Sequence, residues 1–405
     1  MSKPAGRAAL AFIFVSIVLD IVAFGIVIPV LPKLIESFVN NDAATAARWV
    51  GLFGTIWAFM QFVCAPVLGA LSDRYGRRPV LLLSIAGLGL DYIFMALAPT
   101  LGWLLVGRIV SGMTASGFAT ASAYIADVTE PENRAAAFGI VGAAWGFGFI
   151  VGPALGGVLG ASDPRLPFWV AGGLALVNAL YGFFILPESL PPEKRAGFSW
   201  ARANPLGSLQ FLRAHRELLP LAGVSFLYNL GHTVYPSVFV LWAGYVLGWG
   251  AKEVGFGLAI VGIANVVVQG GIVRPLIRRL GERTALAIGA TAGTIGFTLY
   301  GFTAAPWLVW IAIFVYAPAG VFNPSLMGVM SKRVGPSGQG RLQGATSSLM
   351  GITGMAGPPL FTLSFAAMIQ PDSSWHLPGL PFFIAAVLFA AAGLLAMRAT
   401  RATEA

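Results

Sequence analysis

The feature that most constrains this chain is a succession of long apolar stretches, each close to the length of a membrane crossing. A helix needs about 20 predominantly apolar residues to span the hydrocarbon core of a bilayer. Only 10% of the 405 residues are charged, whereas about a quarter are charged in a soluble globular domain. We therefore predict an all-α membrane protein with twelve transmembrane helices. The expected helices cover residues 8–31, 49–71, 79–98, 102–124, 135–160, 167–186, 218–246, 254–274, 284–303, 307–330, 342–369 and 379–397.

A polar segment near the middle divides these stretches into two groups of six. We predict an amino-terminal bundle over 1–186, a cytoplasmic linker over 187–217 and a carboxy-terminal bundle over 218–405. The two halves share weak sequence echoes: "GPALGG" at position 152 recurs as "GPPLFT" at position 357, and "DRYGRRPV" recurs as "RRLGERTA", which places Gly281 opposite Gly76. Duplicated halves are typical of secondary transporters.

The basic residues indicate how the helices are oriented. The net charge is +9, but one side of the predicted topology holds only Lys33, Arg48, Arg165 and Lys252. Cytoplasmic loops of membrane proteins are enriched in Lys and Arg, so we expect both termini and the linker in the cytoplasm. This orientation explains the basic charge without a nucleic-acid partner. We expect a multi-pass protein of the inner (plasma) membrane, without a cleaved signal peptide, because the first apolar run continues to about Leu31.

A loop between the second and third helices has a distinctive order of charges, "GALSDRYGRRPVLLLS" at 69–84. Gly76 suits the tight turn. Asp127, at the end of the fourth helix, is expected to face Arg77 or Arg78. A plain positively charged loop would explain the arginines but not the fixed order of acid, glycine and base. Exposed ion pairs contribute only about 0–1 kcal/mol each, which suits a gate that must open. The predicted cytoplasmic gate comprises Asp73, Arg74, Gly76, Arg77, Arg78 and Asp127.

This loop resembles the signature of the major facilitator superfamily, and the resemblance extends over nearly the whole chain. "GRIVSGMTASGFATASAYIAD" at 107–127 is similar to the family's fourth-helix motif, and "GFGFIVGPALGG" at 146–157 to the fifth-helix motif associated with antiporters. "LDIVAFGIVIPVLP" at 19–32 and "LDY" at 90–92 resemble the tetracycline-efflux branch of the drug/proton antiporters. The resemblance implies two pseudo-symmetric six-helix bundles around a central cavity.

The fifth helix also has a direct physical interpretation. Glycines recur at every fourth position from Gly148 to Gly160, which forms a smooth stripe where a neighbouring backbone can approach closely. A proline removes one helical hydrogen bond and permits a bend. Ordinary packing of small residues is one explanation, and a bendable helix at a moving interface is the other. The residues of this motif are Gly148, Gly152, Pro153, Gly156 and Gly157.

Three charged residues interrupt the apolar spans of the first half: Asp20, Asp91 and Arg108. The two acids lie about twelve residues into their helices, or roughly 18 Å, near the middle of the bilayer. Ionisable groups at this depth are costly and usually functional. A static acid–arginine pair that holds helices together is the alternative. We predict that the three residues couple proton binding to a conformational change, with Asp20 or Asp91 as the main proton carrier.

Polar and aromatic side chains elsewhere in the spans are candidates for a substrate cavity, although each would equally suit a hydrogen bond between helices. These candidates are Trp57, Gln61, Asn229, His232, Tyr235, Asn265, Gln269 and Asn323. The chain departs from the tetracycline branch in the second half. The resemblance implies a histidine in the eighth helix and an acid in the ninth, where this sequence has Asn265 and an uncharged stretch at 286–296.

Together these features predict a proton-coupled antiporter that exports a lipophilic, tetracycline-like drug by alternating access. A broad multidrug exporter and a proton symporter for a small metabolite remain open alternatives, and a membrane sensor or scaffold is a third. No nucleotide-binding loop or metal-binding cluster is visible in the sequence. We therefore expect no enzymatic activity and no cofactor, with the proton gradient as the energy source. The expected partners are a small lipophilic substrate, protons and the bilayer, and the protein is expected to be a monomer.

Overall fold

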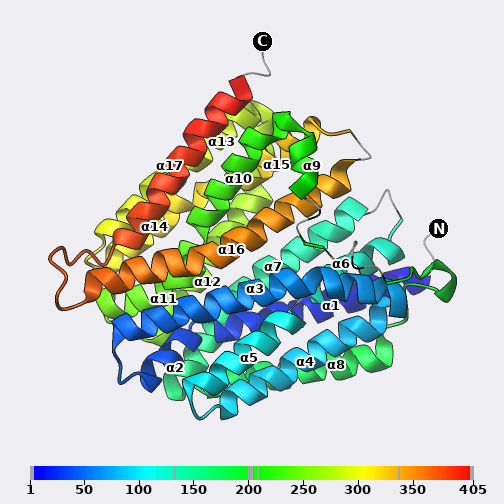
Figure 1. Cartoon of the computed structure of the whole chain (residues 1–405), viewed down its shortest axis with the longest axis horizontal. Helices are drawn as coiled ribbons and strands as arrows, with labels where there is room; N and C mark the ends of the chain where they lie inside the picture. The colour runs from blue at the N-terminus through cyan, green and yellow to red at the C-terminus, as the bar shows by residue number, and fades with distance from the viewer. Residues whose placement is uncertain are drawn as a thin grey trace. The chain divides into compact units, whose positions relative to one another are not determined.

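The computed structural model describes residues 4–115, 117–130, 134–198, 200, 204–205, 207, 209–335 and 338–401, with side chains described from residue 13 onward except at 117–119, 134–136 and 138–140. Within these ranges the chain is helical and contains no β-strand (Figure 1). The prediction of an all-α protein is therefore confirmed. The helices of the first part of the chain are α1 (Pro4–Val27), α2 (Leu31–Phe38), α3 (Ala43–Tyr75), α4 (Arg77–Leu97), α5 (Leu101–Thr114), α6 (Gly117–Val128), α7 (Arg134–Ser162) and α8 (Leu166–Ile185).

A short helix, α9 (Leu209–Ala214), lies within the predicted linker 187–217. The remaining helices are α10 (Leu219–His232), α11 (Val234–Leu247), α12 (Ala251–Val267), α13 (Val273–Phe302), α14 (Pro306–Tyr316), α15 (Phe322–Lys332), α16 (Gln339–Ile369) and α17 (Leu380–Arg401). A π-helical turn at Val268–Ile272 joins α12 to α13, and a 3-10 turn at Ala317–Val321 joins α14 to α15.

Ten helical stretches in the described part of the chain are long and apolar enough to cross a membrane, and α5 is a shorter apolar helix. The longest, Ala251–Phe302, contains the expected span 254–274 and all but the last residue of the expected span 284–303. Its helical backbone is interrupted at Gly281, where φ is 77° and ψ is 166°. With this stretch counted as two crossings, and α5 with α6 as one, the structure agrees with the predicted twelve helices.

Several spans are interrupted where the apolar pattern indicates continuity. The first, expected over 8–31, ends at Val27. Three others are each divided between two helices: 102–124, 218–246 and 307–330. Pro236 lies in the first turn of α11, and Pro318 lies in the turn between α14 and α15. Because proline lacks an N–H donor, it favours the start of a helix over its interior, which explains two of these divisions.

The described helices pack into two compact units. The polar middle segment is not the only boundary between them. The first unit contains Met1–Phe38, Ile56–Pro205 and Gly250–Gly262, and the second contains Val39–Thr55, Leu206–Trp249 and Ile263–Ala405. Each unit therefore includes a short stretch from the opposite half of the sequence. The prediction of bundles over 1–186 and 218–405 stays a prediction.

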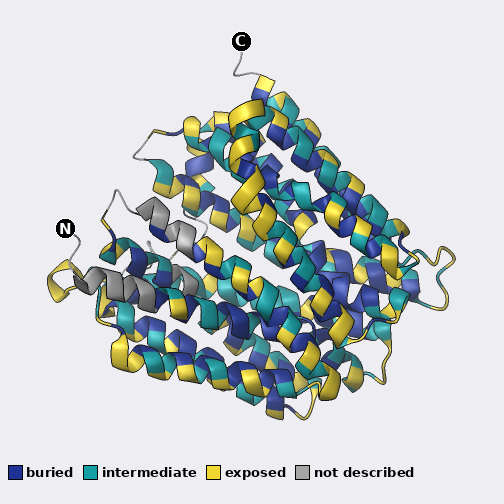
Figure 2. Cartoon of the chain, turned by 180° about the vertical axis from the view of Figure 1, so that it is seen from behind, coloured by how far each residue is buried: buried dark blue, intermediate teal, exposed yellow. Residues whose placement is uncertain are grey.

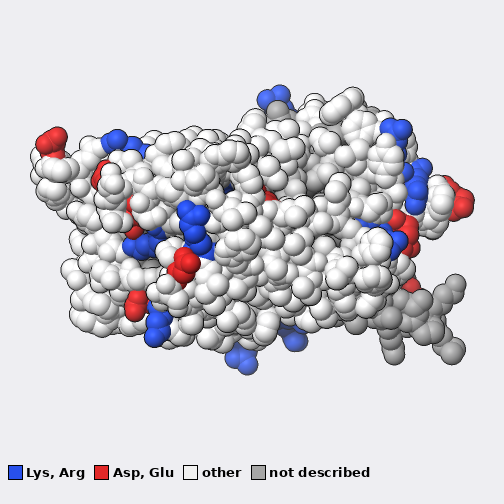
Figure 3. All heavy atoms as spheres, turned by 90° about the horizontal axis from the view of Figure 1, so that it is seen from below, with Lys and Arg blue, Asp and Glu red and all other residues white. Residues whose placement is uncertain are grey.

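In the first unit, α1 packs on α7 and α8, and α4 packs on α5 and α8. The core contains Ile17, Ile21 and Ile85, together with Tyr124 of α6. The outward faces of the same helices are also apolar, with Leu83, Val177 and Phe184 between 60% and 75% exposed. Figure 2 shows exposed and buried residues alternating around each helix, and most of the face in Figure 3 is uncharged. In a bilayer these outward faces contact acyl chains, so their exposure carries no penalty.

The second unit is held together by an aromatic core. Its helices α13 and α10 both pack on α17. Tyr228 stacks on Phe322 with ring centroids 4.7 Å apart, and Tyr300 stacks on Phe382 at 5.2 Å. Aromatic pairs at such separations add about 0.5–1.5 kcal/mol beyond the apolar area that they bury. The core of this unit is therefore mainly aromatic, whereas Asp20, Asp91 and Arg108 lie in the first unit.

Candidate functional site

The deepest charged residues of the first unit are Asp91 on α4 and Arg108 on α5. Asp91 is 3% exposed, and both of its carboxylate oxygens are buried without a hydrogen-bond partner among the described residues. Arg108 interacts electrostatically with Asp91, but no ion pair within 4.0 Å joins them in the described part of the chain. The two side chains therefore do not form a closed salt bridge.

Arg108 is instead held over the ring of Trp57. Its guanidinium carbon lies 5.3 Å from the ring centroid, and Trp57 in turn stacks on Phe24 of α1 at 5.9 Å. An arginine over an aromatic face is stabilised by about 0.5–2 kcal/mol. Trp57 is a predicted cavity residue, and the structure places it beside the arginine of the predicted proton-coupling group.

Asp20 of α1 is partly buried, and its Oδ1 atom has no hydrogen-bond partner among the residues described. Tyr92, the residue after Asp91 on α4, is 1% exposed and lies in the electrostatic environment of Asp20, Asp91 and Arg108. The sequence analysis did not assign a role to Tyr92, although it lies in the "LDY" stretch. A buried charge without a partner is strongly disfavoured, so these acids are suited to holding a proton.

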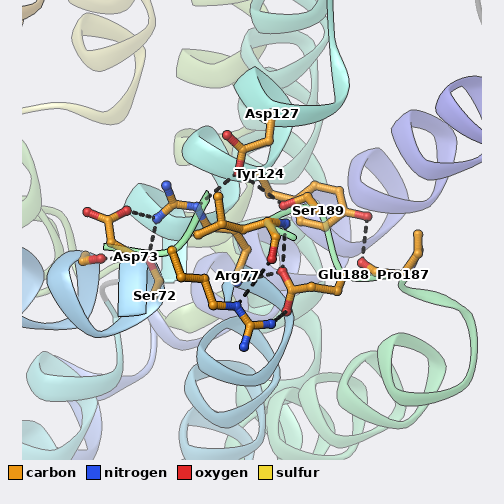
Figure 4. A network of polar contacts seen from close by, with 11 residues as sticks. Ser72, Asp73, Arg77, Tyr124, Asp127, Pro187, Glu188 and Ser189 are labelled. Carbon is orange, nitrogen blue, oxygen red and sulfur yellow. Dashed lines mark hydrogen bonds and ion pairs between the residues drawn. The ribbon is translucent and has the colours of Figure 1, made fainter. Parts of the chain in front are cut away.

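The predicted gate residues form a polar network at the junction of α3, α4 and α6 (Figure 4). Arg77 pairs with Asp73 at 2.5 Å and with Asp127 at 3.1 Å. Its Nη1 atom also donates to Ser72 Oγ at 2.6 Å. The side chain of Arg77 is only 12% exposed, whereas that of Asp73 is 42% exposed. We refer to Ser72, Asp73, Arg77 and Asp127 as the charged latch.

Two arginines of the predicted gate lie outside the charged latch. Arg74 lies over the ring of Tyr75, with 5.1 Å between the guanidinium carbon and the ring centroid. Arg78 donates from Nη2 to the carbonyl oxygen of Phe183 at 2.6 Å. Of the two arginines expected to face Asp127, it is therefore Arg77 that does.

The segment after α8 adds groups that sequence reasoning missed. Glu188 Oε1 accepts hydrogen bonds from the backbone N–H of Arg77 at 2.9 Å and of Leu190 at 3.0 Å. It thereby satisfies an N–H in the first turn of α4, which has no partner within the helix. Ser189 Oγ donates to Asp127 Oδ2 at 3.2 Å. The only signal in the sequence was an acid shortly after a predicted span. That signal does not show that Glu188 caps α4, whose first residue, Arg77, lies 111 residues earlier in the chain.

Gly76 makes this capping possible. Its backbone has φ 108° and ψ 156°, which is accessible to glycine but strained for other residues. A Cβ atom at this position would also overlap Glu188 Oε2. Glycine is thus required both by the backbone conformation and by the contact with the capping carboxylate.

We expect Glu188→Ala to destabilise the protein by about 0.5–2 kcal/mol, the usual effect of losing a helix cap. The replacement leaves the N–H of Arg77 without its acceptor. Thermal unfolding of the purified protein measures this as a lower midpoint. Glu193→Ala is the matched control, because Glu193 is an exposed acid in the same segment. An unchanged midpoint for Glu188→Ala would show that the cap does not contribute to stability.

The second unit contains a counterpart of the latch with its charges exchanged. Gly281 shares the positive φ of Gly76. The next residue, Glu282, pairs with Lys332 at 2.8 Å. Gly281 lies 205 residues after Gly76. The same offset of 205 residues relates Glu282 to Arg77 and Lys332 to Asp127. Each unit therefore ties the start of one helix to the end of another, with base and acid reversed.

The glycine stripe of α7 forms a close contact with α1. A Cβ atom at Gly152 would lie 2.7 Å from Gly25 Cα, and one at Gly156 would overlap the carbonyl group of Ile26. Gly148 packs on Ile21 in the same way. The contacts of Gly152 and Gly156 involve backbone atoms, so no rotamer change could relieve them. Pro153 lies inside the helix, and its Cδ atom would be 3.1 Å from a Cβ at Gly25.

Gly157 points to a different partner within the first unit. A Cβ there would lie 2.6 Å from the carbonyl oxygen of Ala251 and 3.0 Å from Gly255 Cα, both at the start of α12. The two faces of α7 thus contact α1 and α12 closely. The predicted motif residues are therefore all at tight helix–helix contacts, which is the arrangement that small residues allow in membranes.

The remaining cavity candidates differ in their environments. In the first unit, Gln61 is partly buried. In the second unit, Asn229 donates to the carbonyl oxygen of Ser225 at 2.7 Å within its own helix. Tyr235 is buried in the aromatic core, 5.3 Å from Tyr316 by ring centroids.

The other candidates of the second unit lie near Tyr228 or near the π-helical turn. His232 is exposed, and its ring lies 6.0 Å from that of Tyr228. Gln269 is exposed within the π-helical turn, and Asn265 faces Gly320, where a Cβ would lie 3.3 Å from its Oδ1. Asn323 is partly buried in the first turn of α15. π-Helical turns are often found at functional sites. Asn265 and Gln269, at this end of α12, therefore remain candidates for the substrate cavity.

The sequence and the fold both match known proteins. A family model described as Major Facilitator Superfamily matches residues 13–358. The tetracycline resistance protein, class C, of Escherichia coli is 37% identical over 94% of this chain and 94% of its own length. The class G protein of Vibrio anguillarum is 38% identical over 88% of this chain and 90% of its own length.

Solved structures agree with these sequence matches. The human organic anion transporter MFSD10 (TETRAN) is 25% identical, with a TM-score of 0.71 over 97% of this chain and 100% of that chain. The nucleoside transporter NupG is 14% identical, with a TM-score of 0.77 over 98% of this chain and 100% of that chain. The second likeness concerns the fold alone.

Proposed function

Because the chain belongs to the Major Facilitator Superfamily of membrane transporters, we propose that it exports a tetracycline-like drug from the cytoplasm in exchange for protons. The observation that carries this proposal is the pair of acids within the spans, Asp91 and Asp20, whose Oδ1 atoms have no hydrogen-bond partner among the described residues, with Arg108 held over Trp57 nearby. The identity of 33–38% to tetracycline resistance proteins supports the substrate class. The substrate remains small and lipophilic, and the proton gradient supplies the energy without a cofactor.

The proposed coupling depends on the distance between acid and arginine. A carboxyl group in a region of low dielectric constant can hold a proton near neutral pH, and an approaching guanidinium favours its release. Arg108 lies over Trp57 rather than in a salt bridge, so a shift of α5 relative to α4 would change its distance from Asp91. In this scheme Asp20 and Asp91 bind the proton, and drug binding triggers its release.

The charged latch and the glycine stripe are the proposed moving parts of alternating access. The latch pairs at the start of α4 close one side, and the exchanged pair Glu282–Lys332 acts in the same way in the second unit. Each pair is partly exposed, so it is weak enough to open. We infer that both termini lie in the cytoplasm and that a monomer is the transporting species.

We expect Glu282→Lys to slow transport by up to about fivefold, because a pair of this kind contributes about 0–1 kcal/mol and the variant places two cations together. The exchange of both residues, Glu282→Lys with Lys332→Glu, restores the pair and is expected to restore the rate. Initial rates of tetracycline uptake in inside-out vesicles measure both effects. If the double variant is as slow as the single one, the pair itself is not what closes this end.

The proposed function is tested in proteoliposomes with a pH gradient. Tetracycline and a panel of unrelated lipophilic drugs are added, and drug movement and internal pH are followed together. Proton movement opposite to tetracycline supports antiport. Movement of both in the same direction would indicate a symporter, and equal transport of the whole panel would indicate a broad multidrug exporter. No drug movement under any gradient would overturn the proposal.

A further inference from the structure

A cavity in the first unit adjoins the charged latch, at the end of α3, the start of α4 and the end of α8. Its volume is about 620 Å³. The lining residues are Tyr75, Arg78, Pro79, Leu82, Leu83, Ala86, Phe183, Glu188 and Arg195. Tyr75 ends α3, Arg78 lies in the first turn of α4, and Phe183 lies in the last turn of α8. Since these helices are membrane spans, the cavity lies at the boundary between the bilayer and water.

The polar end of the cavity is cationic. No carboxylate of the described residues lies within ion-pair distance of Arg78. Its Nη2 donates to the carbonyl oxygen of Phe183, but its Nε is buried with no partner in the described ranges. Arg195 lies 4.0 Å from Glu188, whose other oxygen already accepts two backbone hydrogen bonds. The cavity thus holds two guanidinium groups and one carboxylate, only Arg195 lies near that carboxylate, and the Nε–H donor of Arg78 remains unused.

The rest of the cavity is apolar and continues along α4. Pro79, Leu82, Leu83 and Ala86 follow one another at helical spacing and form one face of the helix. From Pro79 to Ala86 this face extends about 10 Å into the span at 1.5 Å per residue. Leu83 is 70% exposed and Phe183 59% exposed. A ligand here would be anionic at the boundary and hydrocarbon toward the interior.

We propose that this cavity binds an anionic phospholipid. Its phosphate accepts hydrogen bonds from Arg78 and Arg195, and one acyl chain lies on Leu82, Leu83 and Ala86. Basic pockets between transmembrane helices are suited to anionic head groups, and arginine forms strong charge-assisted hydrogen bonds with phosphate. The volume is within the range of about 300–1,000 Å³ that is usual for small-molecule sites.

The test uses the full-length protein, purified in a neutral detergent and titrated with phosphatidylglycerol or phosphatidylcholine of identical acyl chains. Mass spectrometry of the intact complexes counts the retained lipids. We expect preferential retention of phosphatidylglycerol. We expect Arg78→Gln with Arg195→Gln to lower that retention at least about tenfold, toward the level of phosphatidylcholine. Arg398→Gln is the matched control, because Arg398 is an exposed arginine in the last turn of α17, outside the cavity, and is expected to retain the lipid.

A second variant and a competing ligand test the same assignment if the double variant does not fold. Ala86→Trp fills the apolar floor without changing a charge and is expected to lower retention as well. Inorganic phosphate lacks the acyl chain and is expected not to displace the lipid at millimolar concentration. Equal retention of both lipids, unchanged retention in both variants, or complete displacement by inorganic phosphate would each overturn the assignment of a phospholipid.

Discussion

Asp20→Asn is expected to abolish the uphill accumulation of drug while leaving the protein folded. Each elementary charge moved across the membrane contributes about 2.3 kcal/mol per 100 mV. A tenfold ratio corresponds to about 1.36 kcal/mol. Loss of one coupled proton therefore lowers the accumulation ratio by about 50-fold at about 100 mV. Asparagine keeps the size and polarity of the side chain but cannot bind and release a proton, so downhill drug movement should continue. The measurement is steady-state tetracycline accumulation in inside-out vesicles, with and without a proton gradient.

The matched control for this experiment is Asp42→Asn. Asp42 precedes α3, and its carboxylate accepts from the backbone N–H groups of Ala44 and Thr45. The side-chain hydrogen bond from Thr45 holds the pKa of Asp42 below its usual value. Asp42 therefore stays ionised at neutral pH and cannot carry the coupled proton, and asparagine preserves the cap. If Asp20→Asn accumulates drug as well as Asp42→Asn does, Asp20 is not the proton carrier.

Gly152→Leu is expected to prevent the first unit from packing. A Cβ at this position would lie 2.7 Å from Gly25 Cα and 2.9 Å from the carbonyl oxygen of Val22. Overpacking usually destabilises by about 1–3 kcal/mol, and more where backbone must move. Here α1 and α7 would have to separate, which would also displace Asp20 on α1. We expect little folded protein by size-exclusion chromatography and no transport.

Gly142→Leu on the same helix is the matched control. Among the described residues, no atom outside the neighbouring backbone of the same helix lies within 4 Å of a Cβ built at Gly142, so a leucine there meets open space. The same substitution on the same helix is then expected to leave the elution profile unchanged. A normal profile and normal transport for Gly152→Leu would show that α1 and α7 can separate without loss, contrary to the proposed role of the glycine stripe.

The sequence predicted the fold well because its signal is local. A membrane-spanning helix satisfies its backbone within itself, so length and apolar content identify it without knowledge of its neighbours. This is why the twelve spans could be counted. The divisions within 218–246 and 307–330 were missed. At each of them one helix ends and the next begins without a change in apolar content, so the apolar pattern gives no sign of the break. Pro236 and Pro318 mark these points, but proline alone does not distinguish a kink from an end.

The candidate site was predicted unevenly. The sequence named Asp73, Arg77 and Asp127, because acids and bases at the ends of spans are conspicuous in a chain with few charges. It did not identify Glu188, whose role requires that the end of α8 lie beside the start of α4. It also did not identify Tyr92, because a tyrosine in an apolar helix becomes informative only when its neighbours are known.

The sequence by itself determined that the chain is a helical membrane protein, how many times it crosses, and which few charges lie at depth. Each of these depends on the free energy of placing a residue in lipid, which is a property of the residue and its immediate neighbours. Only the tertiary structure decided which partner each charge has. It placed Arg108 over Trp57 rather than in a salt bridge with Asp91, Arg77 rather than Arg78 against Asp127, and Glu188 at the start of α4. These contacts join residues on different helices, and packing between helices fixes them.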